Sequence, residues 1–228
     1  MLLNFGKFKN DAKVILEKRN NQDYFLIGEI YINIKGSFWG LFYLRQPPWD
    51  YGKPQKWLVA LVEKGRLKSC KTIDLGCGQG NDSIYLTKKG FDVIGVDFST
   101  RAIKKAKQRA RNADLNIKFM VDDVTNLRNV SGKFQLVVDN GCLHTIIGKK
   151  ARDNYVKTVL NITKPGSHYF LRCFIKDPER RINPITSLFR LSITEVEQRF
   201  GNHFEIDEIR KPFPGMVVHI LLMTRKSN

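Results

Sequence analysis

Short apolar segments alternate with segments of helical periodicity from residue 71 to the end of the chain. The apolar segments are rich in β-branched residues, whereas the segments between them repeat apolar residues every three or four positions. This alternation is typical of a parallel sheet covered by helices on both faces. It predicts strands at about 71–75, 92–96, 116–121, 134–138, 167–174, 203–209 and 217–224, and helices at about 54–65, 80–89, 99–112, 149–162 and 193–200.

The last two predicted strands break the alternation, because no helical segment separates them. Residues 211–215, with the sequence Lys-Pro-Phe-Pro-Gly, join them instead. Proline and glycine interrupt regular structure and favour a turn. We therefore expect the final pair of strands to form an antiparallel hairpin at one edge of the sheet.

The first predicted strand leads into a glycine-rich loop, in which residues 74–80 read Asp-Leu-Gly-Cys-Gly-Gln-Gly. Glycine lets the backbone take positive φ angles and approach a ligand without a Cβ. The next helix begins with Asn, Asp and Ser, all good capping types, and its free N–H groups would face the ligand. Asp97 follows Asp74 by 23 residues, close to the roughly 20-residue offset of a ribose-binding acid. The pattern indicates an adenosine site, with a structural glycine turn in another α/β domain as the alternative.

The spacing of the glycines narrows the ligand. Gly-x-Gly-x-Gly after an acid differs from the Gly-x-Gly-x-x-Gly that cradles a pyrophosphate. Here the chain resembles the class I S-adenosylmethionine-dependent methyltransferases, whose first motif reads acid-x-Gly-x-Gly-x-Gly. The resemblance implies S-adenosyl-L-methionine as cofactor, a sulfonium cation with an amino acid tail and no phosphate. Local charge is consistent with this, because residues 70–97 hold four acids and three lysines in a chain of net charge +17.

The length of 228 residues and the hydrophobic content of 42% suit one globular domain with a full core. We predict a single-domain, Rossmann-like α/β fold with a seven-stranded, mostly parallel sheet, helices on both faces and an antiparallel edge strand. The resemblance implies the same ending. Residues 1–34 are predicted to be an N-terminal extension of unknown role, and residues 35–228 the methyltransferase domain, with the sheet core at 71–228.

An aromatic-rich segment, which we call the lid segment (residues 35–56), precedes the sheet core. Its six aromatic residues lie in a stretch broken by glycine and proline, and a surface loop would not normally expose so many. They are Phe38, Trp39, Phe42, Tyr43, Trp49 and Tyr51. The segment is either a lid or pocket wall, or an extension packed against the sheet.

Residues 47–55, Pro-Pro-Trp-Asp-Tyr-Gly-Lys-Pro-Gln, carry a narrower resemblance. Together with Asp139, Gly141, Cys142 and His144 further along the chain, they look like small bacterial and archaeal methyltransferases related to the thiopurine, thiol/halide and tellurite-resistance enzymes. In those enzymes a Pro-Trp-Asp segment closes over the methionine end of the cofactor. The resemblance therefore implies that Trp49 contacts the cofactor.

Further cofactor contacts are expected at successive strand ends. The third predicted strand ends in Asp122, Asp123 and Val124. In the resembled family an acid here meets the adenine amino group, and alignment with the family's Gly-Asp-Val pattern places Asp123 in that role. The predicted cofactor-binding residues are Asp74, Gly76, Cys77, Gly78, Gly80, Asn81, Asp97, Phe98, Asp123, Val124, Asp139 and Trp49.

The fourth predicted strand runs into residues 139–144, Asp-Asn-Gly-Cys-Leu-His, which face the transferred methyl group in the resembled fold. The Asn/Asp-Pro-Pro-aromatic sequence of exocyclic-amine methyltransferases is absent here, and Cys142 lacks the proline that precedes the nucleophilic cysteine of C5-pyrimidine enzymes. With the narrower resemblance, these features favour a small-molecule acceptor: a thiol, a halide or chalcogen, or a phenol- or quinone-like hydroxyl. For a hydroxyl, His144 is the candidate catalytic base, because an unperturbed imidazole takes up a proton near neutral pH. A histidine that belongs to the pocket wall is the alternative.

The four cysteines lie far apart in the sequence, so we predict free thiols and no metal site. Cys77 and Cys142 fall in the predicted pocket, where we favour a packing role over a chemical one.

The net charge of +17 suggests a second class of function, since basic proteins often bind nucleic acid. The excess is spread along the chain, however, and residues 101–111 keep their apolar positions at helix spacing, so their basic side chains form a solvated face. An RNA or protein methyltransferase that docks through this charge is therefore the alternative function. A cofactor-binding protein without turnover is a third.

No segment approaches the roughly 20 apolar residues that span a bilayer, and the N-terminal residues do not resemble a secretion signal. We therefore expect a cytoplasmic enzyme with a small-molecule acceptor and no membrane partner. The sequence leaves the oligomeric state open.

Overall fold

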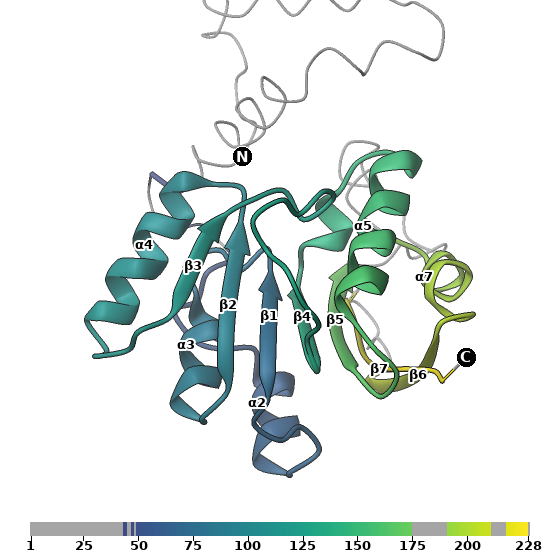
Figure 1. The fold of residues 1–228 in the computed structure, drawn as a ribbon, viewed down its shortest axis with the longest axis horizontal. Coiled ribbons are helices and arrows are strands. Elements are labelled where there is room, and N and C mark those ends of the chain that lie inside the picture. The colour runs from purple at the N-terminus through teal and green to yellow at the C-terminus, as the bar shows by residue number, and fades with distance from the viewer. Residues whose placement is uncertain (1–42, 45–46, 48, 175–190, 211–217, 228) are drawn as a thin grey trace, which may run out of the picture.

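One seven-stranded sheet organises the residues that the computed structural model describes, which are 43–44, 47, 49–174, 191–210 and 218–227 (Figure 1). The strands are β1 (Lys71–Leu75), β2 (Asp92–Asp97), β3 (Lys118–Val121), β4 (Leu136–Asn140), β5 (His168–Phe174), β6 (Phe204–Arg210) and β7 (Val218–Arg225). The helices are α2 (Lys56–Glu63), α3 (Asn81–Lys88), α4 (Thr100–Arg111), α5 (Lys149–Ile162) and α7 (Ile193–Phe200), with the 3-10 turn η1 (Leu143–Thr145). Each of these strands and α-helices ends within two residues of its predicted range.

The strand order is β3-β2-β1-β4-β5-β7-β6. The five strands from β3 to β5 are parallel, and β7 pairs antiparallel with both β5 and β6. The predicted Rossmann-like fold and its terminal hairpin are confirmed, with β6 as the outer strand. The order reverses between β1 and β4, which is where open α/β sheets bind ligands, beyond the carboxyl ends of the strands.

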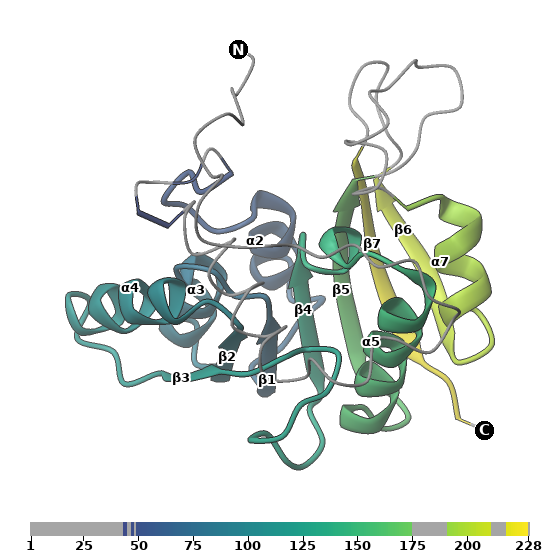
Figure 2. The ribbon, with the colours of Figure 1, turned by 90° about the horizontal axis from the view of Figure 1, so that it is seen from above.

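The central strands send alternate side chains into two separate hydrophobic clusters, because successive residues of a strand face opposite sides of the sheet. In β4, Leu136 and Val138 pack with apolar residues of α2, α3 and α4, whereas Val137 packs with α5 and α7. Figure 2 shows the same division, with α2, α3 and α4 above the sheet and α5 and α7 on the other side. Helices on both faces thus support the carboxyl ends of the strands, from which the loops leave the sheet.

The basic run at residues 101–111 forms helix α4, as its periodicity predicts. The helix buries its apolar stripe of Ala102, Ile103, Ala106 and Ala110, and the Ser99 hydroxyl caps its N-terminus by accepting a hydrogen bond from the Ala102 N–H. Lys104 and Lys107 are exposed on the opposite side.

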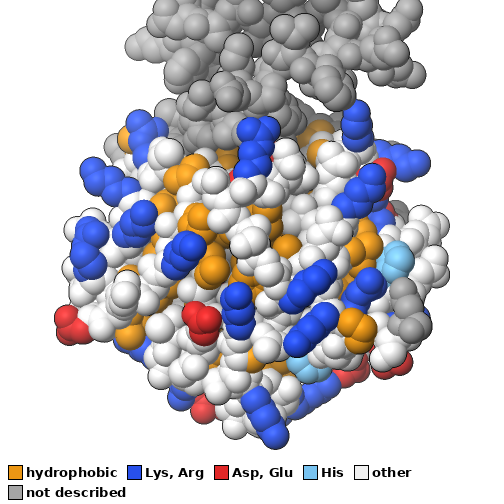
Figure 3. Space-filling model, viewed as in Figure 1, with side chains coloured by type: hydrophobic (Ala, Val, Ile, Leu, Met, Phe, Trp, Pro, Cys, Tyr) orange, Lys and Arg blue, Asp and Glu red, His pale blue; other side chains and the backbone are white. Residues whose placement is uncertain are grey.

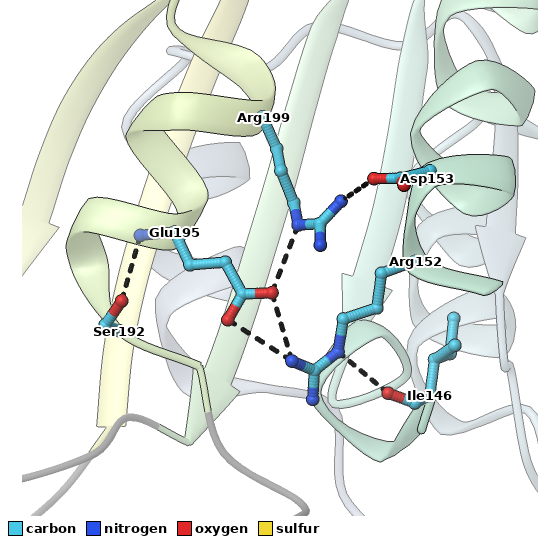
Figure 4. Close-up of polar contacts among 6 residues, drawn as sticks. All are labelled: Ile146, Arg152, Asp153, Ser192, Glu195 and Arg199. Atoms are coloured by element: carbon cyan, nitrogen blue, oxygen red, sulfur yellow. Dashed lines mark hydrogen bonds and ion pairs between the residues drawn. The ribbon is translucent and has the colours of Figure 1, made fainter. Parts of the chain in front are cut away.

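Helices α5 and α7 are joined by a network of ion pairs (Figure 4). Glu195 of α7 accepts hydrogen bonds from Arg152 of α5 (Nη1 to Oε1, 3.0 Å) and from Arg199 (Nε to Oε1, 3.1 Å), and Arg199 also pairs with Asp153. The Nε of Arg152 donates to the carbonyl of Ile146 (2.8 Å), the residue that follows η1. The network therefore fastens the loop after β4 to the helical layer.

Several predictions concern residues outside the described part of the chain. They are the N-terminal extension (1–34), the lid-segment aromatics Phe38, Trp39 and Phe42, and the turn at 211–215. The division of the chain into these segments stays a prediction.

Candidate active site

A cavity of about 380 Å³ lies at the carboxyl ends of β1, β2, β4 and β5. It brings together residues of the lid segment, the glycine loop and the two strand ends beyond it. Its described lining consists of Tyr43, Trp49, Asp50, Asp74, Gly76, Cys77, Gly78, Gln79, Asn81, Asp82, Asp97, Phe98, Asn140, Gly141, Cys142, His144, Thr145, Arg172 and Phe174.

The glycine loop reaches this position through backbone angles that other residues rarely adopt. Gly76, Gly78 and Gly80 have φ angles of 72°, 55° and 81°. A Cβ on Gly76 would lie 2.7 Å from the Cβ of Cys142, and a Cβ on Gly80 would lie 2.9 Å from the Cζ of Phe119. Gly76 therefore allows β1 and the loop after β4 to approach each other under the cavity, whereas Gly80 allows helix packing and does not line the cavity.

Asp97 ends β2 with its carboxylate at the cavity wall. One oxygen accepts a hydrogen bond from the Ser99 N–H (2.8 Å) and the other from the Gly78 N–H (3.0 Å), so the side chain is fixed against the glycine loop. Burial raises its pKa to about 6, although the two N–H donors act in the opposite direction. A carboxylate held in this way at the end of β2 can accept hydrogen bonds from the two hydroxyls of a ribose.

Asp74 begins the acid-glycine motif and is 2% exposed. It accepts a hydrogen bond from the Ser83 hydroxyl (2.6 Å). Burial raises the pKa of Asp74 to about 8, and the neighbouring Asp82 raises it further in the same direction. Asp50, Asp82 and Asp97 join it on the wall, so four carboxyl groups line one small cavity. Such a wall favours a cationic ligand and disfavours a polyphosphate.

The lid segment is tied to the glycine-loop side of the cavity through Asp50. Its carboxylate accepts hydrogen bonds from the Asn81 amide at the start of α3 (2.7 Å), from Arg109 of α4 (3.2 Å) and from the Gly52 N–H (2.8 Å). Arg109 also donates to Asn81 (2.8 Å). Asp50 therefore holds this part of the lid segment against α3 and α4 at the cavity.

Of the three described lid-segment aromatics, Tyr43 and Trp49 line the cavity and contact each other edge to face, with ring centroids 6.4 Å apart, whereas Tyr51 is exposed. Trp49 thus lines the same cavity as the glycine loop, and its contact with the cofactor stays a prediction.

A second polar group spans the lid segment, α3 and β4 through Asp82. Its carboxylate accepts hydrogen bonds from the Gln55 N–H (2.6 Å) and from the Asn140 amide (2.7 Å). Among the described residues, Asn140 Oδ1 and Gln79 Nε2 are buried without a hydrogen-bond partner. Because buried polar atoms are nearly always satisfied, this acceptor and this donor on the cavity wall are suited to a ligand that carries both an ammonium and a carboxylate group.

Asp139 serves the loop after β4 and does not line the cavity. Its oxygens accept hydrogen bonds from the N–H groups of Gly141, Cys142 and Leu143 (3.0, 2.6 and 2.9 Å) and from the Tyr155 hydroxyl (2.6 Å). Both oxygens are thus engaged, and burial raises the pKa of Asp139 to about 6. The side chain fixes the loop that presents Asn140, Cys142 and His144.

His144, Thr145, Arg172 and Phe174 form one part of the cavity lining, which we call the aromatic end. The His144 ring is buried and contacts the Phe174 ring edge to face, with centroids 4.9 Å apart. The Arg172 guanidinium carbon lies 5.3 Å from the centroid of the same Phe174 ring. This end of the site combines aromatic surface, one cation and one imidazole.

Asp123 and Val124 do not line the cavity. Asp123 accepts hydrogen bonds from the Thr125 N–H and hydroxyl (2.8 and 2.7 Å), while the buried Asp122 accepts from the N–H groups of Arg128 and Asn129 (3.0 and 2.8 Å). The adenine contact of Asp123 therefore stays a prediction.

Two cysteines lie at the cavity, as predicted, and neither has the environment of a nucleophile. Burial raises the pKa of the Cys77 and Cys142 thiols well above its usual range, and nearby carboxylates act in the same direction. Their surroundings favour packing.

Sequence reasoning did not name several of the lining residues as site residues, among them Asp50, Gln79, Asp82, Asn140, Thr145, Arg172 and Phe174. Asn140 and Arg172 could have been found by the strand-end rule, since they face each other in register across the carboxyl ends of β4 and β5. No local signal distinguishes Asp82 from an ordinary first-turn acid of a helix.

No helix in the described part of the chain is both long enough and apolar enough to cross a membrane.

The chain is similar to known methyltransferases in sequence. Residues 73–166 match the methyltransferase domain family. The chain is 32% identical over 121 residues to an uncharacterised methyltransferase of Schizosaccharomyces pombe, covering 53% of this chain and 82% of that protein. It is 30% identical over 132 residues to the 2-heptyl-1-hydroxyquinolin-4(1H)-one methyltransferase of Mycobacteroides abscessus, covering 58% of this chain and 57% of that protein.

Solved structures share the fold. The 1,6-didemethyltoxoflavin N1-methyltransferase of Burkholderia thailandensis, determined with S-adenosylhomocysteine, superimposes with a TM-score of 0.68 at 22% identity, covering 87% of this chain and 90% of that one. TehB of Haemophilus influenzae gives a TM-score of 0.62 at 18% identity, covering 85% and 67%.

Proposed function

The chain belongs to the S-adenosylmethionine-dependent methyltransferases, and we propose that it methylates a small aromatic acceptor at a hydroxyl oxygen. The observation behind the proposal is the acid-lined cavity of about 380 Å³, together with its aromatic end. That volume lies near the lower limit of small-molecule sites, which span about 300–1,000 Å³.

The donor fits the polar part of the cavity in charge and in hydrogen bonding. Asp97 would bind the ribose hydroxyls. Asp74 and the free oxygen of Asn140 would face the ammonium group of the methionine end, and Gln79 would donate to its carboxylate. Trp49 would cover this end from the lid segment. When bound, the donor supplies a methyl group already activated by a positively charged sulfur.

The acceptor would occupy the end formed by His144, Thr145 and Phe174. Aromatic rings prefer edge-to-face or offset contacts, and the perpendicular His144 and Phe174 rings offer two such surfaces to a planar molecule. The Mycobacteroides relative is named for a hydroxyquinolone, an aromatic N-hydroxyl compound. This chain covers only 57% of that relative. That the two proteins share a type of acceptor is therefore part of the proposal.

The chemical step would be an in-line displacement. The acceptor oxygen attacks the methyl carbon, an O–C bond forms, and the C–S bond breaks with its electron pair left on sulfur. The hydroxyl proton would pass to His144, the imidazole at this end of the cavity. The protein's own contribution is to align the acceptor and exclude water.

A panel assay tests the proposal. Purified protein is incubated with S-adenosylmethionine and 2-heptyl-1-hydroxyquinolin-4(1H)-one, simple phenols, aromatic thiols and iodide, while S-adenosylhomocysteine and methylated products are quantified by mass spectrometry. We expect turnover with aromatic hydroxyl compounds, and a drop of about 10²–10⁴-fold in kcat for His144→Ala if the imidazole is the base. Turnover with thiols or iodide alone would contradict an oxygen acceptor.

The basic surface is the observation behind the alternative, an RNA or protein acceptor. Figure 3 shows Lys and Arg side chains spread over one face of the molecule, with few acidic ones between them. The carboxyl groups inside the cavity oppose a phosphate chain there. Binding of bulk tRNA that weakens steeply with salt, together with its methylation, would favour the alternative.

A further inference from the structure

Arg172 lies at the aromatic end of the cavity, which the proposed function assigns to the acceptor. It faces Asn140 across the paired ends of β5 and β4. It is the one lysine or arginine among the described residues that line the cavity, and its guanidinium carbon lies 5.3 Å from the centroid of the Phe174 ring. Its Nη1 would lie 3.7 Å from a Cβ on Gly141, so the charged group sits beside the loop that carries His144.

This cation has no close counter-ion within the described structure. None of the ion pairs among the described residues includes Arg172, even though four carboxyl groups share its cavity. Burial lowers its pKa, against the opposing influence of Tyr51 and Asp82. A partly desolvated charge that forms no ion pair among the described residues is unfavourable, so the site is suited to an anion supplied by a ligand.

Two anionic groups could meet Arg172: the carboxylate of the donor or an ionised acceptor. The glycine-loop side already offers the donor carboxylate the unpartnered Nε2 of Gln79. Arg172 instead lies in the aromatic end, next to Phe174 and near His144. The position therefore favours the acceptor.

We propose that Arg172 determines acceptor specificity by binding the acceptor as an aromatic oxyanion, such as a phenolate or a ring N-hydroxylate. The inference rests on the proposed function and adds the charge state of its substrate. Once the hydroxyl proton has left, the oxyanion lies against the guanidinium, while the ring packs on Phe174. Attack of the oxyanion on the methyl carbon forms the O–C bond, and the C–S electron pair stays on sulfur. The negative charge of the acceptor and the positive charge of the sulfonium are both lost in this step.

A chromogenic probe measures this directly, without turnover. The protein saturated with S-adenosylhomocysteine is titrated with 4-nitrophenol, and the phenolate is followed by its visible absorbance across a pH series. We expect bound nitrophenol to ionise at lower pH than free nitrophenol, with its ionisation constant raised about tenfold or more. Arg172→Met should remove this increase and weaken binding at least tenfold.

The matched variants separate charge from folding. Arg172→Lys keeps the charge and should retain part of the increase. Arg66→Met removes an arginine whose ion pair with Asp207 is exposed, and it should leave the probe unaffected. If Arg172→Met does not fold, as judged by circular dichroism, Arg172→Lys carries the test through its smaller but measurable change.

Three results would overturn the inference. The first is that wild-type protein leaves nitrophenol ionisation unchanged or does not bind the probe. The second is that Arg172→Met and Arg172→Lys both match wild type. The third is that Arg172→Met weakens S-adenosylhomocysteine binding tenfold in calorimetry, which would assign Arg172 to the donor carboxylate.

The proposed function fails independently, by the acceptor panel. Turnover of thiols alone, with nitrophenolate still bound by Arg172, would reject the hydroxyl acceptor and leave the anion site standing.

Discussion

Raising the pH is expected to destabilise the ligand-free protein, because its cavity region contains buried carboxyl groups. Burial raises the pKa of Asp97 to about 6, that of Asp139 to about 6 and that of Asp74 to about 8, from a usual value of 3.8. The folded chain therefore holds more protons than the unfolded chain between about pH 4 and pH 8. Stability is greatest below this window and falls as the pH rises through it.

The magnitude follows from Asp97, which is 4% exposed. Its pKa rises by about 2, and each pKa unit corresponds to about 1.4 kcal/mol, so the free energy of unfolding should fall by about 3 kcal/mol between about pH 4 and pH 6. Asp139 acts over the same window, and Asp74 extends the decline toward pH 8. Such a loss is a large part of a typical total of about 5–15 kcal/mol.

Urea unfolding followed by circular dichroism, at about pH 4.5, 5.5, 6.5 and 8, measures this loss. Asp97→Asn removes one titrating group, so the dependence of the free energy of unfolding on pH should become less steep by the contribution of Asp97. The control is Asp92→Asn, at an exposed position of the same strand, which should leave the slope unchanged. A free energy of unfolding that stays constant or rises from pH 4.5 to 8 would refute the reasoning, as would an unaltered slope in Asp97→Asn.

Three further changes test other parts of the site. Because a cationic ligand favours ionised carboxylates, S-adenosylmethionine should bind more tightly as the pH rises from about 5 to 8 in calorimetry, and a flat profile would contradict an acid-lined seat. Asp50→Ala removes the hydrogen bonds that join the lid segment to α3 and α4. It should weaken S-adenosylhomocysteine binding about tenfold, the size expected for two lost hydrogen bonds, and should change Tm little. Gly76→Ala should lower the free energy of unfolding by at least about 2 kcal/mol more than Gly65→Ala does. Both glycines have positive φ, but only at position 76 would a Cβ lie 2.7 Å from the Cβ of Cys142. Equal losses in urea unfolding would show that the overlap is relieved.

Local sequence predicts this fold closely. Hydrophobic periodicity places each described strand and α-helix, and the proline- and glycine-containing segment 211–215 predicts the hairpin of β6 and β7. Asp74 and Asp97, the two acids of the predicted adenosine site, both line the cavity, and their contacts with a donor stay a prediction. These features depend on residues close in sequence, since helix and strand periods, caps and tight turns are set within a few positions.

The hydrogen-bond partners of side chains at the site could not be predicted in this way, because they lie far apart in the chain. The oxygens of Asp139, whose contact with the cofactor stays a prediction, accept hydrogen bonds from the following loop and from Tyr155. Asp82 bonds Gln55 and Asn140, which lie 27 and 58 residues away in the sequence. No periodicity reports which of several neighbouring carboxyl groups will face a cavity.

The sequence by itself determined the sheet, its helices and the glycine loop that lies with Asp97 at the carboxyl ends of the strands. Only the tertiary structure decided that Asp50 ties the lid segment to α3. It also decided that, among the described residues, the Asn140 Oδ1 has no hydrogen-bond partner and Arg172 lies beside Phe174 without an ion pair. The physical reason is that backbone geometry follows from local preferences, whereas the pairing of polar side chains follows from which strand ends and loops the packed core brings together.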